Sequence, residues 1–116
     1  MRIELASECP ADQPDPLGRA YCGWRDGLSP AEAWDRGRGV WAARAADVMG
    51  NSLLLITFAG EVKMVGTIDS VTRYNGRVAV TGCPLPNHPL IGQPDPLADY
   101  DSDEPIVFGT VVDRGS

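Results

Sequence analysis

Aromatic rings and arginine side chains cluster between residues 21 and 41. All three tryptophans of the chain lie between Trp24 and Trp41, with arginines among them. Aromatic rings can stack on an unpaired base while guanidinium groups hold the flanking phosphates. A second group surrounds an Asn-Gly pair, where Arg73 and Arg77 would flank a hairpin tip able to enter a groove. The predicted nucleic-acid-binding residues are Tyr21, Trp24, Arg25, Asp26, Arg36, Arg38, Trp41, Arg73, Tyr74, Asn75, Arg77 and His88.

Most of these residues also have a purely structural interpretation. Trp34 lies on an alanine-rich helix face and is expected in the core, and Trp41 could fill the core instead of binding a base. Arg36 and Arg38 could be solvated charges at a helix C-terminus, where cations are favoured. Asp26 could pair with an arginine or accept a hydrogen bond from a base amino group.

Cysteine and histidine content argues against several enzyme classes. The chain has three cysteines, at 9, 22 and 83, and one histidine, and no two cysteines form a CxxC pair. This is the pattern of neither a disulfide framework nor a zinc site. Cys83 and His88 lie in a proline-rich stretch that favours extended backbone, so a hydrogen-bonding loop role is expected for His88 rather than catalysis. With no nucleotide-binding, hydrolase or metalloprotease motif, we expect no catalytic residue, metal or cofactor.

Charge is distributed unevenly along a chain whose net charge is −6. Residues 1–16 carry a net charge of −3 and residues 91–116 a net charge of −5. Residues 17–90 carry a net charge of +2, and almost all of their positive charges are arginines. A basic middle favours binding of nucleic acid, although a GC-rich genome would also enrich arginine. The alternative function is an acidic protein-interaction module, such as an adaptor, immunity or inhibitor protein, acting through the acidic ends.

The elements that must position these residues begin with a helix. Ser29 can cap it, Pro30 suits its first position, Glu32 completes a capping box and Gly37 ends it. Residues 38–43 are predicted to form a strand, and residues 47–50 a single helical turn or a loop. The proline-rich residues 9–17 are expected to be irregular.

A β meander is expected to follow. Residues 52–58, 61–72 and 77–82 are predicted strands, the second bent near Gly66, with a tight turn at 59–60. Asn75-Gly76 predicts a type I′ hairpin turn. A last strand is expected over 105–112. The predicted fold is mainly β within the α+β class: a small, partly open barrel of five or six strands with one or two short N-terminal helices.

Length and composition predict a single domain of 116 residues. Within it we expect a proline-rich extension over 1–18, a barrel body over 19–112 and a proline-rich, acidic loop over 91–104. The sequence Gln-Pro-Asp-Pro-Leu occurs at 13–17 and again at 93–97, which predicts two similar proline-stiffened loops. Neither a membrane helix nor a signal core is apparent, so a cytoplasmic protein is expected, with no membrane partner and a possible homo-oligomer.

The short helix carrying Trp34, the run Arg-Gly-Arg-Gly-Val-Trp at 36–41 and the meander over 53–82 resemble the PUA-like superfamily, which includes SRA, EVE, YTH and ASCH domains. The resemblance spans residues 19–112 and implies a partly open barrel that reads a modified base. In particular, the chain resembles small bacterial proteins that bind 5-methylcytosine in DNA, and this resemblance implies DNA rather than RNA as the partner. By that resemblance Trp24, Tyr21 or Tyr74 would stack on an extruded base and Asp26 would read its edge.

Overall fold

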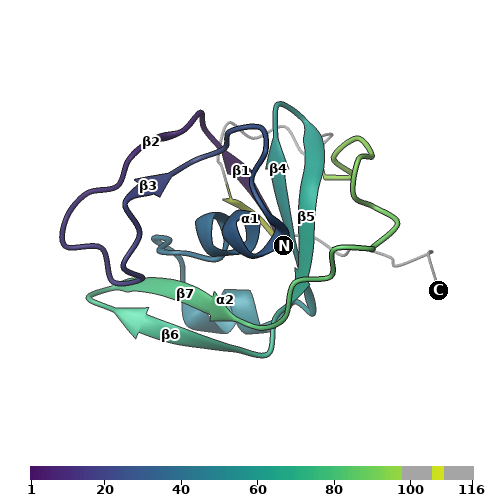
Figure 1. Cartoon of the computed structure of the whole chain (residues 1–116). Coiled ribbons are helices and arrows are strands. Elements are labelled where there is room, and N and C mark those ends of the chain that lie inside the picture. The colour runs from purple at the N-terminus through teal and green to yellow at the C-terminus, as the bar shows by residue number, and fades with distance from the viewer. Residues whose placement is uncertain (98–105, 109–116) are drawn as a thin grey trace.

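The computed structural model describes residues 1–97 and 106–108 (Figure 1). These residues contain eight strands and two helices. The strands form one four-stranded sheet and two separate two-stranded sheets. In chain order the elements are β1 (Arg2–Leu5), β2 (Cys9–Pro10), β3 (Tyr21–Cys22), α1 (Pro30–Gly37), α2 (Ala45–Met49), β4 (Leu53–Phe58), β5 (Glu61–Thr67), β6 (Ser70–Tyr74), β7 (Arg77–Thr81) and β8 (Ile106–Val107).

The four-stranded sheet has the order β5-β4-β1-β8, and β1 runs parallel to β4. Arg2 is paired with Leu55 and Leu5 with Phe58. The first residues of the chain, which the sequence places in an extension outside the barrel, therefore form an inner strand of the main sheet. Only four residues long and half of them charged, this strand has too short an alternating pattern to be identified from sequence.

Both faces of this sheet are covered. Leu54 and Ile56 belong to the larger core on the side of α1, whereas Leu55 faces a smaller cluster that includes Leu85 and Leu90. Successive side chains of a strand point to opposite faces, so the apolar run in β4 fits a strand buried on both sides.

Helix α1 forms as predicted. Ser29 Oγ accepts a hydrogen bond from the Glu32 backbone N–H, and Glu32 accepts one from the Ser29 N–H. Trp34 is 5% exposed and packs over Gly66 of β5, where any side chain would overlap its ring. Gly66 therefore admits the tryptophan rather than marking the bend that the sequence predicts. The expected turn of helix at 47–50 is found as α2.

The strands expected between residues 52 and 82 are found as two hairpins, β4–β5 and β6–β7, which lie in separate sheets, and three strand predictions are corrected. The predicted strand at 61–72 divides into β5 and β6, and the break falls at residues 68–69 rather than at Gly66. Residues 38–43 form no strand: Trp41 alone makes a bridge, to Val78. In the proline-rich stretch, Cys9 and Pro10 do form a short strand, because they pair with Cys22 and Tyr21.

The two turns expected in the meander are confirmed by their backbone angles. Asn75 and Gly76 have φ of 48° and 83°, as a type I′ turn requires, and Ala59 and Gly60 have 52° and 80°. Of the last predicted strand, residues 106–107 form β8, and 105 and 109–112 lie outside the described residues.

The described chain is a mainly-β α+β fold with two short helices. Its strands are not joined into one barrel sheet, because β6 and β7 pair only with each other and β2 only with β3. Isolated bridges join strands to neighbouring segments of the chain, such as Gly66 of β5 to Pro84 after β7. None of the helices in the described residues is long and apolar enough to cross a membrane.

Candidate functional site

A pocket of about 680 Å³ opens between the end of β1, the β2–β3 segment, the C-terminal end of α1 and the β6–β7 turn. In Figure 1 the β6–β7 turn and the β2–β3 segment lie on the same side of the molecule, beside α1. The volume lies within the range of small-molecule sites. Of the predicted binding residues, those that line it are Arg36, Trp41, Tyr74, Asn75 and Arg77.

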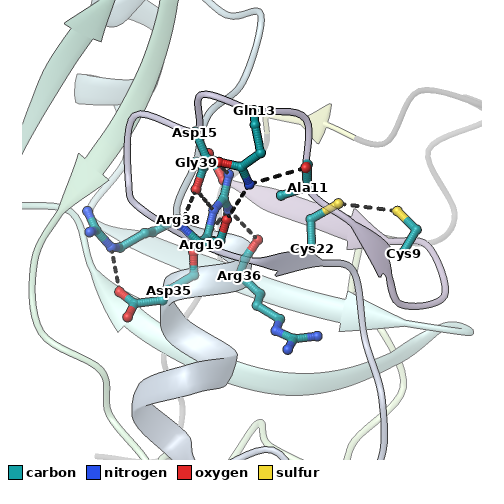
Figure 2. Close-up of polar contacts among 10 residues, drawn as sticks. All are labelled: Cys9, Ala11, Gln13, Asp15, Arg19, Cys22, Asp35, Arg36, Arg38 and Gly39. Carbon is teal, nitrogen blue, oxygen red and sulfur yellow. Dashed lines mark hydrogen bonds and ion pairs between the residues drawn. The ribbon is translucent and has the colours of Figure 1, made fainter.

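Arg19 fixes the wall that the β2–β3 segment contributes. Its Nη1 donates hydrogen bonds to the backbone oxygens of Asp35, at 3.2 Å, and Gly39, at 2.5 Å. These oxygens lie at the C-terminal end of α1, where unpaired carbonyls need donors and a cation is favoured. Figure 2 shows the guanidinium between this helix end and Asp15. Arg19 thereby anchors the proline-rich segment, residues 9–17, to α1.

Asp15 completes this anchor from the other side. Its carboxylate accepts hydrogen bonds from Arg19 Nε and Nη2, at 2.9 and 3.0 Å, and its side chain is only 5% exposed. The side-chain hydrogen bond from Arg19 is the main reason that the pKa of Asp15 is lowered from its ordinary value. The pair is therefore ionised at neutral pH and holds the segment in place.

The pocket arginine that belongs to α1 is held in an ion pair within the protein. Arg36 is buried, and its Nη1 lies 2.5 Å from Glu8 Oε2. Arg25 Nε lies 2.9 Å from the same carboxylate oxygen. Glu8 therefore offsets two positive charges, and neither guanidinium is available to a ligand without losing this contact.

The side of the pocket formed by the hairpin is different. Trp41 Nε1 donates to the Gly37 carbonyl at 2.8 Å, which fixes the indole beside the pocket. Tyr74 is half-buried, while Asn75 and Arg77 are exposed at the turn. Within the described part of the chain, no hydrogen bond or ion pair of the Arg77 side chain is found. This side of the pocket is therefore lined by two aromatic residues and by an arginine whose side chain is not engaged by the described residues.

The structure does not bring the remaining predicted residues to the pocket. Trp24 stacks on Phe58 with ring centroids 6.5 Å apart, and Lys63 Nζ lies 5.4 Å from its ring. Its Nε1 donates to Asp26 at 3.3 Å. Trp24 and Asp26 therefore do not line the pocket with Arg77, because Trp24 packs against Phe58 at the end of β4 and Lys63 of β5.

The other predicted residues are also separated from the pocket lining. Arg38 Nε pairs with Asp35 at 2.9 Å, and its Nη1 donates to the Val80 carbonyl. Tyr21 is 49% exposed on β3, and Arg73 is exposed on β6. His88 is buried in the proline-rich loop, where its Nδ1 accepts a hydrogen bond from the Leu90 N–H. The hydrogen-bonding loop role expected for His88 is confirmed.

The repeated Gln-Pro-Asp-Pro-Leu sequence is the signal that identifies the anchor residues. In both copies the aspartate is nearly buried and pairs with an arginine: Asp15 with Arg19, and Asp95 with Arg2 at 3.0 Å. In both copies it also accepts a hydrogen bond from the leucine N–H two residues later. In both copies, therefore, an aspartate between two prolines binds an arginine. The repeat draws attention to these aspartates, but the sequence alone does not predict their ion pairs.

Two sulfur atoms also line the pocket. Cys9 and Cys22 face each other across the β2–β3 pair, with their Sγ atoms 3.3 Å apart. Among the described residues, no group of three His, Cys, Asp or Glu side chains could hold a metal ion. Comparison of the chain with protein-family models, with curated proteins and with solved structures gives no match.

Proposed function

We propose that this protein is a non-enzymatic nucleic-acid-binding module in which the pocket receives one unstacked base. The observation that carries the proposal is the hairpin side of the pocket, which Trp41 and Tyr74 line together with Arg77, whose guanidinium has no hydrogen bond or ion pair with the described residues. Stacking on aromatic rings and a cationic contact to phosphate are the two interactions that an extruded nucleotide needs. A volume of about 680 Å³ accommodates a nucleoside.

The β6–β7 hairpin supplies the contact to the rest of the nucleic acid. It is a separate two-stranded ribbon with Arg73 and Arg77 near its turn. A ribbon of this width fits the major groove of B-form DNA, whereas the major groove of an RNA duplex is too narrow. Duplex DNA is therefore the favoured partner.

A modified cytosine is the proposed base, in keeping with the resemblance to PUA-like readers of 5-methylcytosine. Tyr74 keeps the stacking role that the resemblance implies, and Trp41 takes the place of Trp24 and Tyr21. Asp12 replaces Asp26 as the acceptor for the cytosine amino group, because it lines the pocket, is exposed and makes no hydrogen bond or ion pair with the described residues. Bridges from β5 to the segment after β7 support a half-open barrel of the PUA-like kind.

The test is fluorescence anisotropy with fluorescein-labelled duplexes that differ only in one 5-methylcytosine, measured over a range of salt concentrations. Removing one phosphate contact by Arg77→Ala should reduce the slope of log K against log salt by about 1. Trp41→Ala and Tyr74→Ala should weaken binding by about 1–3 kcal/mol and reduce the preference for the methylated duplex.

Lys63→Ala is the matched control, because it removes one positive charge on β5, outside the pocket lining. This variant should bind like the unaltered chain. If neither duplexes nor single strands bind at low salt, the proposed function is wrong, and the acidic protein-interaction module becomes the better account. The acidic stretch 99–104 on which that alternative depends lies outside the described residues.

A further inference from the structure

Of the three cysteines, Cys9 and Cys22 lie opposite each other on paired strands, whereas Cys83 has neither of the other two opposite it. They occupy directly opposite positions of the antiparallel pair β2–β3, thirteen positions apart in sequence, and their sulfurs lie 3.3 Å apart (Figure 2). A disulfide requires about 2.05 Å between the sulfurs, and Cβ atoms of directly opposite residues lie close to the separation that a disulfide spans. A bond can therefore form with a small movement of the side chains.

The two thiols differ in their exposure to solvent. Cys9 is exposed, whereas Cys22 is half-buried. Burial, followed by the hydrogen bond with Cys9, raises the pKa of Cys22 above its ordinary value. Because its pKa is raised, Cys22 keeps its proton to a higher pH than an ordinary thiol, and Cys9 presents the more accessible sulfur to solution.

We propose that Cys9 and Cys22 form a dithiol site that reacts with low-molecular-weight disulfides, Cys9 acting as the attacking thiol and Cys22 as the resolving thiol. This inference does not depend on nucleic-acid binding, since it rests only on the two sulfurs and their access.

The reaction has two exchange steps. The Cys9 thiolate attacks one sulfur of the small disulfide, whose S–S bond breaks, and one small thiolate leaves. The Cys22 thiol then loses its proton, and its sulfur attacks Cys9 Sγ in the mixed disulfide and releases the second small thiolate. The protein dithiol is oxidised by two electrons, the small disulfide is reduced to two thiols, and the two protons end on these thiols.

The consequence is a covalent link in the pocket wall. Within the described residues the β2–β3 pair has only two residues on each strand, and both cysteines line the pocket. The disulfide would close the proline-rich segment into a loop and restrict its unfolded chain, so the oxidised protein should unfold at a higher temperature.

The test uses the reduced full chain and bis(2-hydroxyethyl) disulfide, with intact-mass analysis after acid quenching. Cys83→Ser is the matched background, since it removes the exposed cysteine that has no thiol neighbour. This variant should lose two hydrogens and retain no adduct. Cys22→Ser in the same background should accumulate one stable adduct on Cys9, and Cys9→Ser should react several-fold more slowly.

A second measurement keeps the proposal open to refutation if a serine variant folds poorly. Peptide mapping of the oxidised unaltered chain should identify a Cys9–Cys22 cross-link, and its thermal midpoint should rise by several degrees and return on reduction. Two stable adducts in the Cys83→Ser variant, or faster reaction at Cys22 than at Cys9, would overturn the assignment.

Discussion

Arg19 is the residue on which the shape of the pocket depends most. Its guanidinium joins Asp15 on one side to the carbonyls that end α1 on the other. A guanidinium has five donors in a rigid plane, so it can satisfy a carboxylate and several carbonyls together. The proline-rich segment is held mainly by these bonds and by the short β2–β3 pair. Replacing either Asp15 or Arg19 should therefore loosen the pocket wall.

Asp15→Asn should destabilise the protein at neutral pH by about 2–4 kcal/mol, because Arg19 would then be nearly buried without its carboxylate. The pKa of Asp15 is lowered in the folded state, so its contribution is complete above the unfolded pKa and is lost as the pH falls below about 4. The difference between the variant and the unaltered chain should therefore shrink below that pH in urea unfolding curves.

Asp12→Asn is the control for this prediction. Asp12 lies in the same segment but is exposed and makes no hydrogen bond or ion pair with the described residues, so its replacement should leave the unfolding free energy nearly unchanged. Equal destabilisation by both variants would mean that the Asp15–Arg19 pair does not anchor the segment.

At the scale of elements, the pocket depends on how α1 packs against the sheet. Trp34 lies over Gly66 of β5, and Gly37 at the end of the helix lies against Ile56 of β4. Each glycine removes a side chain where helix and strand approach closely. This close approach determines where the last turn of α1 ends, and with it the position of the carbonyls that Arg19 binds and of the segment carrying Trp41.

Gly66→Ala should destabilise the protein by about 1–3 kcal/mol, because a methyl group would overlap the Trp34 ring and force the helix away from β5. Thermal unfolding followed by tryptophan fluorescence would measure this. Gly50→Ala is the comparison: it follows α2 with an ordinary φ of −72° and room for a Cβ, so we expect no loss of stability. A Gly66→Ala variant as stable as Gly50→Ala would contradict the packing argument.

At the scale of the whole molecule, the two Gln-Pro-Asp-Pro-Leu loops stabilise opposite parts of one fold. The first fixes the pocket wall to α1, and the second joins the late proline-rich loop to the first strand through Asp95 and Arg2. In Figure 1 the loop that follows β7 lies on the far side of β5 from the β2–β3 segment. The same five residues therefore act as a local clamp at two separate places.

Asp95→Asn should destabilise the protein by about 2–4 kcal/mol, since Arg2 and Asp95 are both nearly buried. Because no partner is shared by the two clamps among the described residues, the effects of Asp15→Asn and Asp95→Asn should add within about 0.5 kcal/mol in the double variant, measured by denaturant unfolding. A coupling energy well above that value would show that the clamps act as one unit.

The sequence by itself determined the elements whose signals are local. The capping box at Ser29 and Glu32, the Asn-Gly turn and the apolar run of β4 each depend on a few adjacent residues, and each is found where it was predicted. The same holds for the mainly-β α+β class. Short-range hydrogen bonds and backbone preferences decide these features, so they can be recognised without knowing what packs against them.

Only the tertiary structure decided which residues meet. It brought the β6–β7 turn beside Trp41 and turned Trp24 away toward Phe58. It also placed β1 beside β4, more than fifty positions later, and opposed Cys9 to Cys22. These arrangements arise from pairings between distant segments, whose free energy comes from burial and ion pairs that no local pattern records.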